Sequence, residues 1–224
     1  MTTSGTIAYS MTARSLVTFA LKLLNITPGT QSPSAEDMRD GAQTLDMMLK
    51  TWMMSGPNLF RQTFGSVALV AGQESYVLTP RPYRVIEARY RNTSGIDIPM
   101  FEMTRQEYVD LPLKTSPGIP TTYYIDIQRA STTLYVWPVP NSVTTETIKY
   151  TYQRVIEDVG AYDNEIDIPQ EWFETVGYNL ADRLAEQFNV PPSKDVTARA
   201  LYLYQTAMDM DREPVVRFMP ERMR

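Results

Sequence analysis

The chain has 224 residues, of which 43% are hydrophobic and 21% are charged, and its formal net charge is −5. These values are typical of a globular protein with a real core, and they exclude a chain that is disordered throughout. Because the balance is acidic, any contact with nucleic acid would need a local basic patch.

Cysteine and histidine are both missing from the chain. The first absence excludes disulfides and thiolate chemistry, and the second excludes Ser-His-Asp catalysis and histidine-ligated zinc. Carboxylate catalysis stays open. The longest apolar stretch, Leu16 to Leu24, is interrupted by Thr18 and Lys22 and is too short for a membrane span, so we expect neither a span nor a signal peptide.

Two helices are expected first. Apolar residues recur at helical spacing from Ala13 to Leu24, with Thr12 as a candidate N-cap. Ser34 and Asp37 then form a capping box that opens a second helix, which Gly56-Pro57 ends.

The second helix has an expected apolar stripe of Met38, Ala42, Leu45, Leu49 and Trp52. Met47 and Met54 lie away from this stripe, and methionine suits surfaces that adapt to a partner, so both are candidates for a subunit contact. Asp46 and Lys50 are spaced for an ion pair along the helix.

From residue 58 to 156 apolar and polar residues alternate, which predicts antiparallel strands with one exposed face. A hairpin turn is expected at Gln128 to Thr132, and Thr104 with Glu107 predicts a short capped helix. The residues expected on core faces are Ile86, Ala88, Tyr90, Tyr123, Ile125, Ile127, Ile148, Tyr150 and Tyr152.

Two further helices are expected near the end, the first opened by Pro169 and the second capped by Ser193. Their apolar stripes are Phe173, Val176, Leu180, Leu184 and Phe188, and then Val196, Ala200, Leu203, Ala207 and Met210. Neither helical flank can bury its stripe alone. The sequence therefore predicts an α+β fold in which 1–57 and 165–213 form a helical bundle, 58–164 an inserted antiparallel β module, and 214–224 a C-terminal docking tail.

Two charged motifs could in principle bind a ligand. Acidic residues between Asp163 and Glu174 match a calcium loop at several positions, but Ile168 stands where the loop needs glycine, so we expect no metal site. Arginines alternate with aromatic residues from Arg81 to Arg91, which can bind nucleic acid, but the period of two favours a solvated strand face.

The tail combines apolar and basic residues, which a disordered segment seldom needs. It either docks on a partner or packs on the bundle. The residues expected to dock are Val215, Val216, Arg217, Phe218, Met219, Arg222 and Arg224.

Several phrases follow one another in an order that resembles the head-to-tail connector proteins of short-tailed bacteriophages, also described as tail accessory or packaged-DNA-stabilising factors. The resemblance covers roughly residues 12 to 190. The phrases are Ser15-Leu16-Val17-Thr18-Phe19-Ala20-Leu21, Ser34-Ala35-Glu36, Leu49-Lys50-Thr51-Trp52, Gly72-Gln73-Glu74-Ser75-Tyr76, Pro117-Gly118-Ile119-Pro120, Leu134-Tyr135-Val136-Trp137-Pro138-Val139-Pro140 and Ile168-Pro169 with Trp172.

The resemblance implies a structural head-to-tail adaptor, located in the virion neck and in the host cytoplasm during assembly. It implies a dodecameric ring of this chain beneath the portal protein, with the C-terminal segment on the portal and a tail nozzle or tube protein below. Genomic DNA would pass through the lumen without sequence-specific binding. We expect no cofactor and no catalytic activity. The alternatives are another neck or tail ring protein, such as a tube or completion protein, and a carboxylate-based cell-wall hydrolase.

Overall fold

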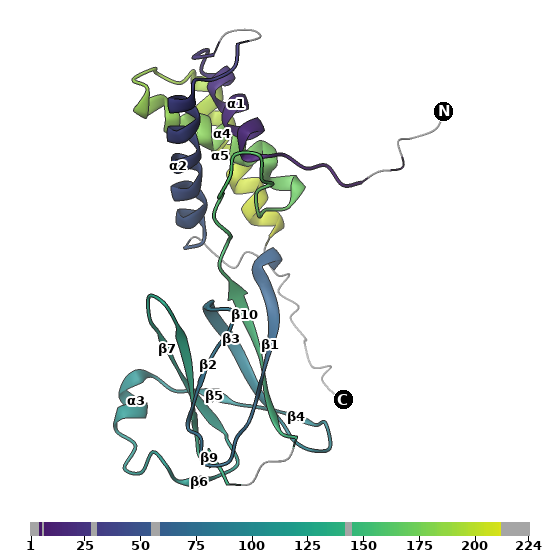
Figure 1. Cartoon of the computed structure of the whole chain (residues 1–224), viewed down its shortest axis with the longest axis vertical. Helices are drawn as coiled ribbons and strands as arrows, with labels where there is room; N and C mark the ends of the chain where they lie inside the picture. Colours follow the sequence, from purple (N-terminus) through teal and green to yellow (C-terminus); the bar gives the residue numbers. More distant parts are fainter. Residues whose placement is uncertain (1–4, 6, 28–30, 55–58, 142–144, 212–224) are drawn as a thin grey trace, which may run out of the picture. The chain divides into compact units, whose positions relative to one another are not determined.

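The computed structural model describes residues 5, 7–27, 31–54, 59–141 and 145–211. It has helices towards both ends of the chain and strands in the middle, so the predicted α+β fold is confirmed (Figure 1). The chain divides into two compact units, residues 1–60 with 156–224, and residues 61–155. The predicted domains, with boundaries after residues 57 and 164, stay a prediction, because compactness does not test independent folding.

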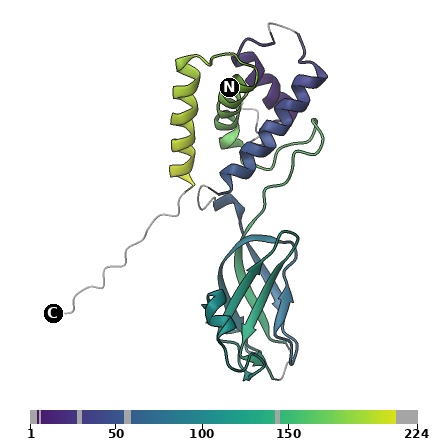
Figure 2. The same ribbon diagram turned by 90° about the vertical axis from the view of Figure 1, so that its left-hand side faces the viewer.

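The first unit is a bundle of four helices: α1 (Ala13–Leu23), α2 (Ala35–Trp52), α4 (Phe173–Gln187) and α5 (Lys194–Met210). Helices α1 and α4 pack together, as do α4 and α5, so the N-terminal and C-terminal helices share one core. A short 3-10 turn, η2 (Gln170–Trp172), leads into α4, and Pro169 caps this turn instead of opening the helix itself. Figure 2 shows α5 as the yellow-green helix on one side of the bundle.

The helix ends agree with the sequence signals. The hydroxyl of Thr12 accepts the N–H of Ser15 at 3.2 Å, and Ser34 and Asp37 form both bonds of the capping box. Ser193 caps α5. Small residues bring the helices close, because Gly177 of α4 lies against the ring of Phe19.

Two expectations for the bundle are wrong. Met210, expected on the apolar stripe of α5, is 73% exposed. Asp46 and Lys50 do not pair with each other. Asp46 accepts the N–H of Val159 at 2.9 Å, while the Lys50 ammonium lies 2.6 Å from Asp158, so both side chains fasten the segment that enters the C-terminal half of the bundle.

The second unit follows a 3-10 turn, η1 (Leu59–Arg61), and contains two four-stranded sheets. The first has the order β1 (Gln62–Ala68), β10 (Thr147–Arg154), β3 (Pro82–Arg91), β4 (Asp97–Pro99). The second has the order β2 (Ser75–Val77), β8 (Thr132–Trp137), β7 (Thr122–Ile127), β5 (Phe101–Glu102). A small pair, β6 (Pro117–Gly118) and β9 (Val139–Pro140), is parallel.

One hydrophobic core lies between the two sheets. It contains Leu69, Tyr76, Leu78, Val85, Ala88, Tyr90, Met100, Tyr123, Leu134, Val136, Ile148, Tyr150 and Tyr152. The predicted hairpin joins β7 to β8, where the N–H of Gln128 donates to Ser131. The predicted capped helix is α3 (Arg105–Val109), which lies beside β7, and Tyr108 from it stacks on Tyr124 (Figure 1).

The core prediction fails at Ile86, which is 42% exposed while Val85 is buried. The register of β3 against β10 shifts here: Thr151 faces Glu87, but Tyr152 faces Val85. Ile86 is therefore the additional residue of a β-bulge, which reverses the inside-outside alternation along β3. Ile127, at the end of β7, is likewise exposed and is not a core residue.

Candidate interaction surfaces

The outer face of the first sheet is a shallow hollow of about 250 Å³. Its lining residues come from four adjacent strands: Phe64 and Gly65 from β1, Lys149, Tyr150 and Thr151 from β10, Glu87, Arg89 and Arg91 from β3, and Asp97 from β4. In side-chain charge this hollow has three cations and two carboxylates, so it differs in sign from the acidic chain as a whole.

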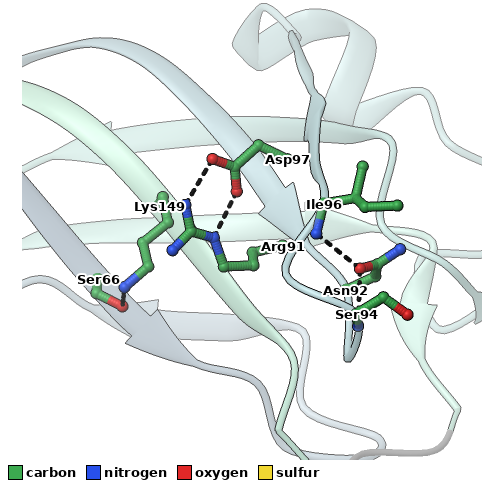
Figure 3. A network of polar contacts seen from close by, with 7 residues as sticks. All are labelled: Ser66, Arg91, Asn92, Ser94, Ile96, Asp97 and Lys149. Atoms are coloured by element: carbon green, nitrogen blue, oxygen red, sulfur yellow. Dashed lines mark hydrogen bonds and ion pairs between the residues drawn. The ribbon is translucent and has the colours of Figure 1, made fainter.

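Most charges in the hollow are already paired. Arg91 donates two bonds of 2.6 Å to the two carboxylate oxygens of Asp97 (Figure 3). Arg89 lies 2.9 Å from Glu87. The hydrogen bonds from Arg91 lower the pKa of Asp97 below its ordinary value. Lys149 donates to the hydroxyl of Ser66 at 2.9 Å.

Two arginines of the basic and aromatic motif, Arg89 and Arg91, line this hollow. Tyr90 is 2% exposed and belongs to the core, so it is not available to stack on bases. Arg89 and Arg91 lie outside, in ion pairs. The arrangement therefore agrees with a solvated strand face. Figure 3 also shows Asn92, whose side-chain oxygen accepts the N–H groups of Ser94 and Ile96 and fixes the turn into β4.

The bundle exposes apolar side chains on two helices. Met47 of α2 and Met54, two residues after the end of α2, are 53% and 70% exposed, as their place off the apolar stripe predicts. Leu201 and Tyr202 of α5 are also exposed, although neither was predicted as a contact residue. Their spacing outside the stripe of α5 was the signal that could have identified them.

A groove of about 460 Å³ lies on the same unit. Aromatic and methionine side chains line it together with one amide and one carboxylate: Tyr9, Met11, Phe19, Phe173, Tyr178, Gln170 and Glu174. Tyr9 fastens the N-terminal segment here, because its N–H donates to Gln170 at 3.1 Å and its ring packs edge-on against Phe173.

The acidic segment after residue 156 has a structural role. Asp163 pairs with Arg14 at 2.7 Å, and this hydrogen bond lowers the pKa of Asp163. Among the described residues no three carboxylates gather as metal ligands would. No helix within the described ranges is long and apolar enough to cross a membrane. The seven predicted docking residues between Val215 and Arg224 lie outside the described residues.

The bundle thus exposes apolar side chains, whereas the hollow on the β module is ion-paired. A family model described as SU10 adaptor protein matches residues 11–222. The chain therefore belongs to this family of phage adaptor proteins, which are structural proteins and virion components, and the resemblance found in the sequence is confirmed. The search among curated proteins gave no match.

Proposed function

We propose that the protein forms a dodecameric ring beneath the phage portal, extends the DNA channel and attaches the tail. The family match over residues 11–222 carries this proposal, since an adaptor associates with other components of the virion. In this role the ring meets the portal on one side and a tail nozzle or tube protein on the other, and the protein enters the virion from the host cytoplasm.

The exposed apolar residues of the bundle support a ring. A closed ring needs two different surfaces on each subunit, one for each neighbour. Met47 lies on α2 and Met54 just after its end, whereas Leu201 and Tyr202 lie on α5, so two separate parts of the bundle offer apolar contact area. Burying such side chains against a neighbouring subunit lowers the free energy of the assembly, because their apolar surface leaves water.

The acidic net charge of the chain suits the wall of a channel through which DNA slides without binding. A net charge of −5 gives little attraction for phosphates, and a channel wall must let DNA slide. The cations of the hollow on the β module are ion-paired or bonded to Ser66, which also limits phosphate binding there.

The C-terminal tail is proposed to dock on the portal through Val215, Val216, Arg217, Phe218, Met219, Arg222 and Arg224. Burying one of its large apolar side chains is worth about 1.5–3 kcal/mol. Around a ring, even part of this free energy gives firm attachment through multivalency. The arginines add ion pairs that salt weakens.

Truncation after Asp211 tests the docking role. We expect the truncated protein to melt at the same temperature as the full chain and to lose binding to the portal in co-sedimentation. As a matched control, Arg222→Gln with Arg224→Gln keeps the apolar residues, so it should still bind but depend less on salt. If the truncated protein melts several degrees lower and still binds the portal, the tail belongs to the fold and this part of the proposal is wrong.

A further inference from the structure

Three of the four edge strands in the two main sheets are guarded against pairing with another chain. On β4 the outward positions are Asp97, which is charged, and Pro99, which has no N–H. On β2 the Gln73 amide donates a 2.7 Å bond to the carbonyl of Ser75. The two-residue strand β5 presents the charged Glu102. Charge, proline and short length are the usual ways in which proteins blunt sheet edges.

Strand β1 is the exception. It has seven residues, none charged and none proline, and it pairs only with β10 (Figure 1). The N–H of Leu69 donates to the backbone carbonyl of Glu146, the residue before β10. Along an antiparallel ladder, residues that hydrogen-bond to the partner strand alternate with residues whose N–H and C=O point away from it. The N–H and C=O groups of Phe64, Ser66 and Ala68 therefore point away from β10. Within the described ranges these groups have no hydrogen-bond partner.

The N-terminal arm, defined as residues 2–11, has matching chemistry. It contains no charged residue and no proline. Its described residues, 5 and 7–11, form neither helix nor strand, and Tyr9 fastens its base to the bundle. Ile7 lies beyond this point and is 91% exposed, while Phe64 on β1 is 85% exposed. These are the two most exposed large apolar side chains among the described residues.

We propose that the arm around Ile7 of one copy pairs as an added strand with the open edge of β1 in the next copy. This inference rests on the proposed ring and names a contact between its subunits beside the apolar residues of the bundle. Strand addition supplies hydrogen-bond partners for the outward N–H and C=O groups of β1. It also buries part of the exposed side chains of Ile7 and Phe64. Arm and edge are different surfaces, as a head-to-tail ring requires.

Because this contact is small, we expect copies of the protein to associate only when the portal holds them next to one another. Phe64, Ser66 and Ala68 offer three N–H donors and three C=O acceptors, which is little against the freedom that two free molecules lose on association. On a portal the neighbours are held at high effective concentration, so the same contact becomes favourable.

Cross-linking between two single-cysteine variants tests the contact, because the chain has no cysteine of its own. Ile7→Cys and Phe64→Cys proteins are mixed with the portal and treated with a short bifunctional maleimide. We expect a covalent dimer that contains one copy of each variant and that depends on the portal. The matched control pair is Ile7→Cys with Val77→Cys, since Val77 is an exposed residue on the guarded edge of β2.

Two readouts separate this inference from the proposed function. If micrographs show rings on the portal but the Phe64→Cys pair cross-links no more than the control pair, the inference is overturned and the ring stands. If no ring forms on the portal, both the proposed function and this inference are contradicted. As a second measurement, Phe64→Lys places a charge on the open edge and should abolish ring assembly, whereas Val77→Lys should leave it intact; equal assembly by both would contradict the inference.

Discussion

At the scale of single residues, Gly41 shows how tightly α1 and α2 approach each other. A Cβ atom at this position would overlap Cγ1 of Val17, which is fully buried and β-branched, so its side chain has little freedom to move. Close packing of this kind cannot be read from an apolar stripe, because the stripe gives a face and not the distance between two helices.

We expect Gly41→Ala to lower the free energy of unfolding by about 1–2 kcal/mol. The overlap with the buried side chain of Val17 places the overpacking cost in the upper part of its usual range, at about 2–3 kcal/mol, against a gain of about 1 kcal/mol in helix propensity. Urea unfolding measures this change. Gln43→Ala, on the exposed face of the same helix, is the control and should stay within about 0.5 kcal/mol of the original protein. A Gly41→Ala protein that is as stable as the original would show that the two helices can separate at no cost.

The carboxylate of Asp97 gives a second test at this scale. Its two bonds to Arg91 lower its pKa in the folded state, so its contribution to stability is present above the ordinary aspartate pKa and is lost as the pH falls through the lowered value. We expect NMR titration to find the lowered pKa, and Arg91→Gln to return it towards the ordinary value. The lowered pKa of Asp163, which depends on Arg14, should not respond to Arg91→Gln; a parallel change at both carboxylates would contradict a local cause.

At the scale of elements, the helix N-termini were predictable because each carries its signal in a few neighbouring residues. Thr12, Ser34, Thr104 and Ser193 all cap helices as expected. The position of Ile86 was not predictable, because a bulge depends on how β3 registers against β10, a strand more than fifty residues away. The partners of Asp46 and Lys50 were also not predictable, because Val159 and Asp158 lie more than a hundred residues further along the chain.

The cap of α2 is the element whose loss is simplest to measure. Ser34→Ala removes the acceptor for the N–H of Asp37 and half of the capping box. We expect the free energy of unfolding to fall by about 0.5–2 kcal/mol, as measured by thermal or urea unfolding. Ser32→Ala, two residues earlier and outside the helix, should have almost no effect. Equal losses from both substitutions would show that the cap does not stabilise α2.

At the scale of the whole molecule, the order of segments was predictable and the exposed surfaces were only partly so. Met47 and Met54 were identified as exposed because they depart from a helical stripe. The open edge of β1 was not, since an edge strand and an inner strand of a half-exposed sheet have the same alternation. Only the strand order separates them.

The most direct test of the adaptor account is electron microscopy of the protein mixed with portal, beside sedimentation of the protein alone at micromolar concentration. The account predicts that the free protein sediments as a monomer or a weak associate, because its contacts are small and become cooperative only on the portal. With portal, closed dodecameric rings should appear on one face of the portal. A stable dodecamer without portal would contradict the assembly order, and portals that remain bare would contradict the adaptor role itself.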